Sequence, residues 1–216
     1  MAVQFIYLHG FASSPSSNKA KVFKTAFEKK GLSLKVPDLD GGDFENMTLS
    51  SQIKIVEDLL DDLENCRYAL IGSSMGGYLA ALISQLRDEV DAIYLIAPAF
   101  EFLTRWNKKI ESQFGKKNIP NTIRVFHYRH NKEVVFHTKI FKDAEKWDKV
   151  LFFRKLPIRI AHGFLDNSVP ITVSRKFVST YPWATLKELN SDHGLISHSE
   201  WLSEDCITFF QTLDLI

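Results

Sequence analysis

The feature that most constrains this chain is a repeated alternation between short, β-rich apolar runs and longer amphipathic segments of helical length. Such alternation is typical of parallel strands joined by crossover helices. Several of the runs are apolar almost throughout, which suits a sheet covered by helices on both faces. The expected fold is therefore α/β, with a mostly parallel sheet of about six strands flanked by helices. The strands are expected at residues 3–8, 32–36, 68–71, 92–96, 158–161 and 185–189.

Three of the expected helices carry recognisable ends. Ser16-Ser17 opens a segment that stops at Lys29-Lys30-Gly31, where cations and a glycine favour a helix C-terminus. Thr48 opens a second helix. Ser197, followed three residues later by Glu200, predicts a capping box at the start of the last helix.

A stretch of about sixty residues separates the fourth expected strand from the fifth. A crossover needs only about ten or twelve residues, so something is inserted. The stretch is too dense in aromatic residues for a solvated loop, and we interpret it as a small helical cap over residues 99–155, before the penultimate strand. No repeat or flexible linker interrupts the chain, so we expect one domain over residues 1–216, large enough to bury an ample core.

The charges nearly cancel, with 27 Lys and Arg against 26 Asp and Glu, so we expect no nucleic-acid partner. Residues 101–150 carry an excess of cations, which is usually just a solvated face. A sharper hypothesis is that these cations favour an anionic group of the substrate. The cations in question are Lys108, Lys109, Arg124 and Arg129. We take Trp106, Arg124 and Arg129 as candidate substrate-binding residues.

The two cysteines, Cys66 and Cys206, match neither a disulfide framework nor a zinc pattern, which fits a reducing cytosol. The first residues lack a basic region ahead of an apolar stretch, so we expect no secretory signal. The long uncharged stretch 68–86 is interrupted by Gly72-Ser73-Ser74-Met75-Gly76-Gly77, which punctuates a strand and a helix. We therefore expect a cytoplasmic protein without a membrane span.

The sharpest motif is Gly72-Ser73-Ser74-Met75-Gly76, which fits G-x-S-x-G between an expected strand and an expected helix. Only Ser74 fits as the nucleophile, because Ser73 would place side chains where a tight strand-to-helix turn has no room. Such a turn strains the serine backbone and points the first amides of the helix toward developing negative charge. The alternative is a small residue that merely fits a tight turn.

A serine hydroxyl is a poor nucleophile unless a base, an orienting acid and an oxyanion site surround it. His193 lies in the loop after the last expected strand, and Asp166 lies in the loop after the penultimate one. His9-Gly10-Phe11 directly follows the first strand. Because α/β sheets build their sites at the carboxyl ends of their strands, we expect these residues to lie near Ser74.

Each assignment has a rival. Asp166 could instead cap the helix that follows it. Asp192 is its nearest competitor as the acid, although neighbouring side chains in an extended loop usually diverge, which disfavours Asp192 beside His193. His198 competes with His193 as the base, but we expect it in the first turn of the last helix.

Five other histidines have plainer interpretations. His9 and His162 each precede a glycine at a strand end, and we expect both to brace loops by hydrogen bonds. His127, His130 and His137 match the spacing of no common metal site, so we expect no metal ligands. No organic cofactor is expected either.

The opening Tyr7-Leu8-His9-Gly10-Phe11-Ala12-Ser13-Ser14-Pro15, together with Gly72-Ser73-Ser74-Met75-Gly76-Gly77, resembles the small bacterial YqiA-like esterases of the α/β-hydrolase superfamily. The resemblance covers both ends of the chain. It implies an α/β-hydrolase fold and a set of site residues. These are Ser74 as nucleophile, Asp166 as acid, His193 as base, and the backbone amides of Phe11 and Met75 as the oxyanion hole.

The expected activity is that of a carboxylesterase or thioesterase that cleaves a small acyl ester or thioester through an acyl-enzyme on Ser74. Two alternatives stay open. The same scaffold could serve an acyltransferase or a peptidase, because fold and triad do not choose the acyl acceptor. A hydrolase-like protein could also bind a ligand with little turnover.

Overall fold

The computed structural model describes residues 2–63, 66–115 and 119–216 of the chain. Its main element is a six-stranded sheet in the order β2-β1-β3-β4-β7-β8, and all five pairings are parallel. The expected α/β fold is confirmed. The strands are β1 (Val3–Leu8), β2 (Leu34–Lys35), β3 (Arg67–Ser73), β4 (Val90–Ile96), β7 (Ile158–Gly163) and β8 (Ala184–Leu189).

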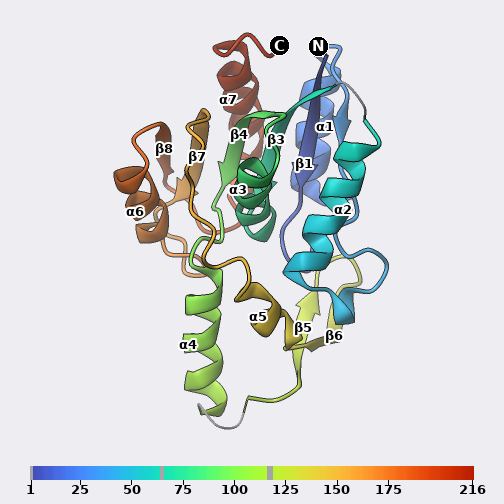
Figure 1. The fold of residues 1–216 in the computed structure, drawn as a ribbon, viewed down its shortest axis with the longest axis vertical. Helices are drawn as coiled ribbons and strands as arrows, with labels where there is room; N and C mark the ends of the chain where they lie inside the picture. Colours follow the sequence, from blue (N-terminus) through green and yellow to red (C-terminus); the bar gives the residue numbers. More distant parts are fainter. Residues whose placement is uncertain (1, 64–65, 116–118) are drawn as a thin grey trace.

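Helices cover both faces of this sheet (Figure 1). On one face α1 (Asn18–Glu28) and α7 (Ser199–Gln211) pack against each other and share a core that includes Phe23 and Phe210. On the other face α2 (Leu49–Asp61), α3 (Met75–Leu86) and α6 (Thr172–Thr180) share a second core. Burial from both sides explains why β3 and β4 are apolar almost throughout.

Two of the predicted helix starts are confirmed. The Ser17 side chain accepts a hydrogen bond from Ala20 N at 3.3 Å, and α1 begins at the next residue. Thr48 Oγ1 accepts from Ser51 N at 3.0 Å, while Ser51 Oγ accepts from Thr48 N at 2.9 Å. This reciprocal pair forms a capping box at the start of α2.

The capping box predicted at Ser197 is wrong. Ser197 lies inside a short 3-10 helix, η2 (Ile196–His198), and α7 begins only at Ser199 without a side-chain cap. Leu195 takes a left-handed conformation, with φ of 47°, and this tight turn delays the start of the helix. The Ser197 hydroxyl pairs with His198 Nδ1 instead.

The segment between β4 and β7, residues 97–157 and called the insertion below, is only partly helical. It contains α4 (Phe102–Phe114), an antiparallel hairpin of β5 (Thr122–His127) and β6 (Lys132–His137), and α5 (Lys139–Ala144). In Figure 1 these elements lie beyond the carboxyl ends of the parallel strands. The burial of β5 alternates residue by residue, a period of two that the sequence carries in Ile123 and Val125.

A short 3-10 helix, η1 (Phe44–Asn46), lies in the connection between β2 and α2 and packs against β6. None of the helices within the described ranges is long and apolar enough to cross a membrane.

Candidate active site

Ser74 stands at the turn between β3 and α3 in a conformation that side chains rarely adopt, with φ of 55° and ψ of −116°. Its glycine neighbours make that turn possible. A Cβ at Gly76 would lie 2.1 Å from the Leu8 carbonyl oxygen, and a Cβ at Gly72 would lie 2.3 Å from the Gly76 carbonyl oxygen. Both are closer than any real contact. The glycine spacing therefore places Ser74, and not Ser73, at the tip of the turn.

The structure brings Ser74, His193 and Asp166 together although the three residues follow three different strands. Ser74 Oγ lies 3.0 Å from His193 Nε2, and His193 Nδ1 lies 2.6 Å from Asp166 Oδ2. With the proton on Nδ1 bound to the carboxylate, Nε2 is free to accept the serine proton. The carboxylate side chain is fully buried, whereas the His193 side chain is 29% exposed. The His193 side chain is therefore partly accessible from solvent.

The environment of Asp166 favours its ionised form. Its Oδ1 accepts hydrogen bonds from Ser168 N at 2.8 Å and Val169 N at 2.7 Å. Burial alone would raise the pKa of Asp166, but the hydrogen bonds from His162, His193 and the Val169 amide outweigh it and hold the pKa well below its usual range. The rival capping role is thus partly real, since one oxygen of Asp166 holds the loop ahead of α6 while the other faces His193.

His162 braces the acid from beneath. The ring is fully buried, its Nε2 lies 3.1 Å from Asp166 Oδ2 and 2.9 Å from the Val169 carbonyl oxygen, and its Nδ1 accepts from Ser174 Oγ at 2.8 Å. The loop-bracing role expected for His162 therefore acts directly on Asp166. The Ser174 contact was missed, because a serine inside a helix carries no signal of its partner across the fold.

Asp192 and His198, the alternative candidates for the acid and the base, have other hydrogen-bond partners. Asp192 Oδ1 accepts from Gly194 N at 3.0 Å and Leu195 N at 3.3 Å, so Asp192 shapes the turn that carries His193. His198 lies beyond that turn and pairs with a neighbouring serine hydroxyl.

Among the backbone amides near Ser74, those of Phe11, after β1, and of Met75, the first residue of α3, have no acceptor in the part of the chain that the structure describes. A Cβ at Gly10 would lie 3.3 Å from Ser74 Cβ, so the chain leaving β1 runs directly against the serine. Free amides beside a nucleophile, one of them at a helix N-terminus, can stabilise a negatively charged oxygen.

Lys19 is a cation behind the serine turn that the sequence analysis missed. Its Nζ donates to Ser73 Oγ at 3.2 Å. Burial lowers the pKa of Lys19 to about 8, although the nearby charges of Asp192 and Asp166 oppose that shift. A signal was present, because Lys19 occupies the first turn of α1, where a cation opposes the helix dipole.

The candidate substrate-binding residues are distributed unevenly. Trp106 lies near the site, with its ring centroid 6.1 Å from that of Phe11. Arg124 is exposed on the hairpin, 3.9 Å from Glu133. Arg129 is paired at 2.8 Å with Asp38, in the loop after β2. The structure therefore brings only Trp106 close to the proposed oxyanion residues.

Arg105 is a half-buried cation whose charge interacts with that of Asp166. It donates from Nη1 to the Phe100 carbonyl at 3.0 Å and from Nη2 to the Ser168 carbonyl at 3.1 Å. Arg105 thus joins α4 to the loop that carries Asp166. Nothing in the local sequence distinguished Arg105 from the other cations of the insertion.

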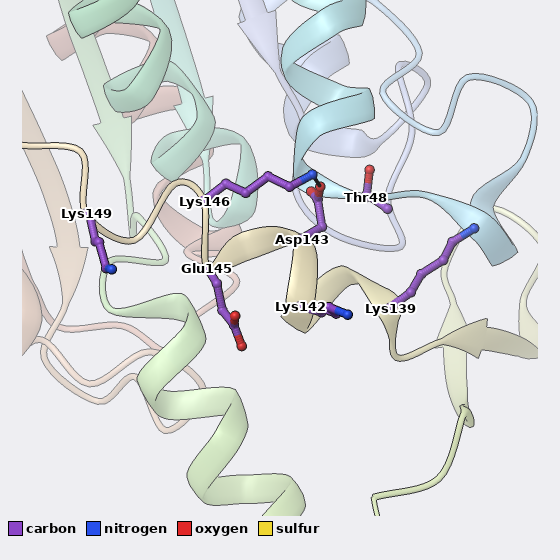
Figure 2. A pocket seen from close by; sticks show the side chains of 7 residues that line it. All are labelled: Thr48, Lys139, Lys142, Asp143, Glu145, Lys146 and Lys149. Carbon is purple, nitrogen blue, oxygen red and sulfur yellow. Dashed lines mark hydrogen bonds and ion pairs between the residues drawn. The ribbon is translucent and has the colours of Figure 1, made fainter.

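Four lysines of the insertion line a surface pocket of about 570 Å³ beside α5. Figure 2 shows that its lysine side chains spread apart, with Lys139 and Lys142 on one side of the pocket and Lys149 on the other. Lys146 is paired with Asp143 at 3.0 Å, and Lys139 donates to Asn46 at 2.9 Å. The lysines do not converge on one point, as a site for a single anionic group would require.

Among the described residues, one group of side chains is close enough to hold a metal ion, and it consists of His9, Asp38 and Asp40. The atoms of these three side chains that could ligate a metal already have hydrogen-bond or ion-pair partners. His9 Nε2 accepts from Leu39 N at 3.1 Å, and Asp38 is paired with Arg129. The group fits a network of hydrogen bonds and ion pairs better than a ligand set. His9 also donates from Nδ1 to the Gly10 carbonyl at 3.0 Å, a loop-bracing contact of the expected kind.

Residues 4–211 match the profile of the family described as Uncharacterised protein family (UPF0227). The chain belongs to this family. Among curated proteins, bovine palmitoyl-protein thioesterase ABHD10, mitochondrial, is 26% identical over 204 residues, which are 87% of this chain and 66% of that protein. A Mycoplasma pneumoniae relative is 30% identical over 62% of this chain and 49% of its own length. The UPF0227 chain thus spans between about half and two thirds of these relatives.

Solved structures confirm the α/β-hydrolase fold. The mouse alpha/beta hydrolase domain-containing protein 10 superposes with a TM-score of 0.83 at 21% identity, over 97% of the UPF0227 chain and 90% of that chain. Est1E from Butyrivibrio proteoclasticus superposes with a TM-score of 0.79 at 18% identity, over 98% and 88% of the two chains. The resemblance stated from the sequence is therefore confirmed at the level of family and fold.

Proposed function

We propose that this protein is a serine hydrolase that cleaves a small acyl ester or thioester through an acyl-enzyme on Ser74. The observation that carries this proposal is the chain of hydrogen bonds from Ser74 Oγ through His193 to the buried Asp166. Similarity to a protein named as a thioesterase supports the class of bond.

Acylation follows from the positions of these groups. Ser74 Oγ attacks the acyl carbon while His193 Nε2 takes its proton, and Asp166 stabilises the resulting imidazolium. The amides of Phe11 and Met75 would meet the oxyanion, and a well-aligned donor of this kind lowers the barrier by about 3 to 4 kcal/mol. His193 then gives the proton to the departing alcohol or thiol. The acyl group stays on Ser74 Oγ.

Deacylation uses the same groups in the reverse roles. A water molecule gives its proton to His193 Nε2 and attacks the acyl carbon, and the tetrahedral intermediate collapses to release the carboxylic acid. His193 returns the proton to Ser74 Oγ. Each of these steps is completed by groups of the chain and water.

The insertion, expected over residues 99–155, would act as the cap that receives the acyl group. A pocket of about 440 Å³ lies between α3, α6 and the insertion. Its wall includes Phe100, Phe152 and Phe177, with Phe100 and Phe177 stacked at 4.2 Å between ring centroids. Tyr78, one helical turn after Ser74, also lines it. We take this pocket, with its aromatic wall, as the candidate site for an acyl chain or an aromatic acid.

A fluorophosphonate probe tests the proposal, because it labels only a serine activated as a nucleophile. The wild-type protein and the matched control Ser73→Ala are expected to be labelled, and Ser74→Ala is not. Hydrolysis of p-nitrophenyl butyrate should fall at least about 10³-fold in Ser74→Ala.

A different pattern of labelling and products would favour the alternatives. If the folded wild-type protein neither reacts with the probe nor hydrolyses esters, the protein is a ligand-binding relative instead. Product analysis with added alcohols and amines separates hydrolysis from acyl transfer.

A further inference from the structure

The hairpin of the insertion contacts the turn after β1, residues 9–12, which carries the Phe11 amide. Tyr128 N, just after β5, donates to the Ala12 carbonyl at 3.0 Å. On β6, the Phe136 ring meets the Phe11 ring edge to face, with 4.9 Å between centroids and 87° between planes. The hairpin therefore holds both the backbone and the side chain of this turn.

The turn is also strained at the residue that the hairpin holds. Ala12 has φ of 55°, a left-handed conformation that costs an alanine on the order of 1 kcal/mol. Such conformations persist only where the surroundings enforce them. The hydrogen bond from Tyr128 N to the Ala12 carbonyl is one such restraint, and it comes from the insertion.

The loop after β2, residues 38–44, holds the same turn from a second side. Phe44 lies 5.3 Å from Phe11 and 5.2 Å from Phe136, so the three rings pack together. Leu39 N donates to His9 Nε2, and His9 Nδ1 donates to the Gly10 carbonyl. The turn is thus fixed between this loop and the hairpin.

Two side-chain contacts join the hairpin to that loop. His127 Nε2 lies 3.3 Å from Asp40 Oδ2, and both side chains are almost fully buried. Arg129 Nη2 donates to Asp38 Oδ2 at 2.8 Å at the edge of the protein. The hairpin, the loop and the turn therefore form one connected assembly around Phe11.

We propose that the hairpin is a positioning element for the oxyanion hole, with Phe136 and Arg129 as positioning residues that keep the Phe11 amide directed at Ser74. This inference rests on the proposed function. It assigns the insertion a role in the chemical step besides that of receiving the substrate. Interactions made only in the transition state change kcat rather than KM, and this difference makes the role measurable.

The test compares Phe136→Leu, Arg129→Ala and Arg129→Lys with the wild-type protein, on p-nitrophenyl butyrate. Loss of a whole oxyanion donor costs about 10²- to 10³-fold in kcat, so a displaced donor should cost about tenfold in Phe136→Leu and about threefold in Arg129→Ala. The KM should stay within about twofold, and Arg129→Lys should recover most of the loss. Lys132→Ala removes a cation at an exposed position of the same hairpin; it is the matched control and should behave as the wild type.

Inhibition by phenylboronic acid gives a second readout, because its tetrahedral serine adduct places an oxygen in the oxyanion site. The inhibition constant should rise with the loss of kcat in each variant. A raised KM at unchanged kcat would overturn the proposal. So would wild-type kcat and wild-type boronate inhibition in folded Phe136→Leu and Arg129→Ala. If Phe136→Leu does not fold, the surface pair Arg129→Ala and Arg129→Lys decides. A wild-type protein without esterase activity removes the proposed function and this inference together, whereas an active protein with silent hairpin variants removes this inference alone.

Discussion

In the parallel sheet, β3 and β4 are buried along nearly their whole length, whereas in the insertion β5 exposes every second residue. The sheet fixes its functional groups through the backbone, because each proposed catalytic residue follows the end of a strand. The insertion is held to the loops and helices around the sheet by side-chain contacts, such as those of Arg129 with Asp38 and of Asp143 with Ser50, besides the backbone bond from Tyr128 to Ala12. We therefore expect substitutions in the two regions to have different effects: those at the sheet edge should lower kcat, and those at the contacts of the insertion should mainly lower stability.

The largest effect is expected at the sheet edge, in Asp166→Asn. The asparagine oxygen can still accept the Ser168 and Val169 amides, but its NH₂ group would face two histidine nitrogens that need an acceptor. His193 then loses the tautomer that accepts the serine proton, and kcat should fall by about 10⁴-fold, as measured by steady-state ester hydrolysis.

Asp192→Asn is the matched control for that change. The new side chain keeps an oxygen for the Gly194 and Leu195 amides, so kcat should stay within about fivefold of the wild type. If the loss is larger in Asp192→Asn than in Asp166→Asn, Asp192 is the acid and the site has been assigned wrongly.

The same contrast explains what the sequence could predict. The strands were predictable because a strand buried on both faces of a sheet is a short, almost continuous apolar run, which can be recognised in the sequence. The convergence of Ser74 and His193 followed from strand ends that share one edge. The hairpin was not predicted, since the density of aromatic residues in the insertion concealed the period of two in residues 122–127.

Contacts between segments that are distant in the sequence could not be predicted, for a related reason. Ser50 and Asp143 are 93 residues apart, and neither residue differs locally from an ordinary surface residue. Lys19 reaches Ser73 across 54 residues. Such pairs depend on how the insertion and the helices settle against the sheet, and a single sequence does not encode that packing in any local pattern.

A smaller effect is expected where the insertion meets the core, in Asp143→Ala. The Asp143 carboxylate accepts from Ser50 N at 2.7 Å and Ser50 Oγ at 2.6 Å, in the first turn of α2. Burial would raise the pKa of Asp143, but these bonds and Lys146 lower it, so the charge is well supported. Its removal should cost about 1 to 2 kcal/mol in the free energy of unfolding, measured with urea.

Glu145→Ala, an exposed position at the end of the same helix, should change the free energy of unfolding by less than about 0.5 kcal/mol. Limited proteolysis of Asp143→Ala should begin in the insertion while the sheet stays resistant. Equal stability losses in the two variants would mean that Asp143 does not anchor the insertion to α2.

The last effect depends on pH and concerns Lys19, whose ammonium group lies behind the serine turn. Its pKa of about 8 in the folded protein is below the ordinary 10.5, because burial disfavours the charged amine. Between those two values the unfolded chain binds more protons than the folded chain, so this group makes stability rise with pH over that window. Below pH 8 the amine is charged in both states and its cost is constant.

Lys19→Met should therefore be more stable than the wild type near pH 7, and the difference should shrink as the pH approaches 10.5. Urea unfolding of both proteins at several pH values measures that difference, and because it is a difference, the titration of the other lysines and the tyrosines cancels. A constant difference across the window would mean that Lys19 keeps an ordinary pKa, with water or a carboxylate at its ammonium group. The charge behind Ser74 would then be shielded, and the electrostatics of the site would depend on Asp166 and His193 alone.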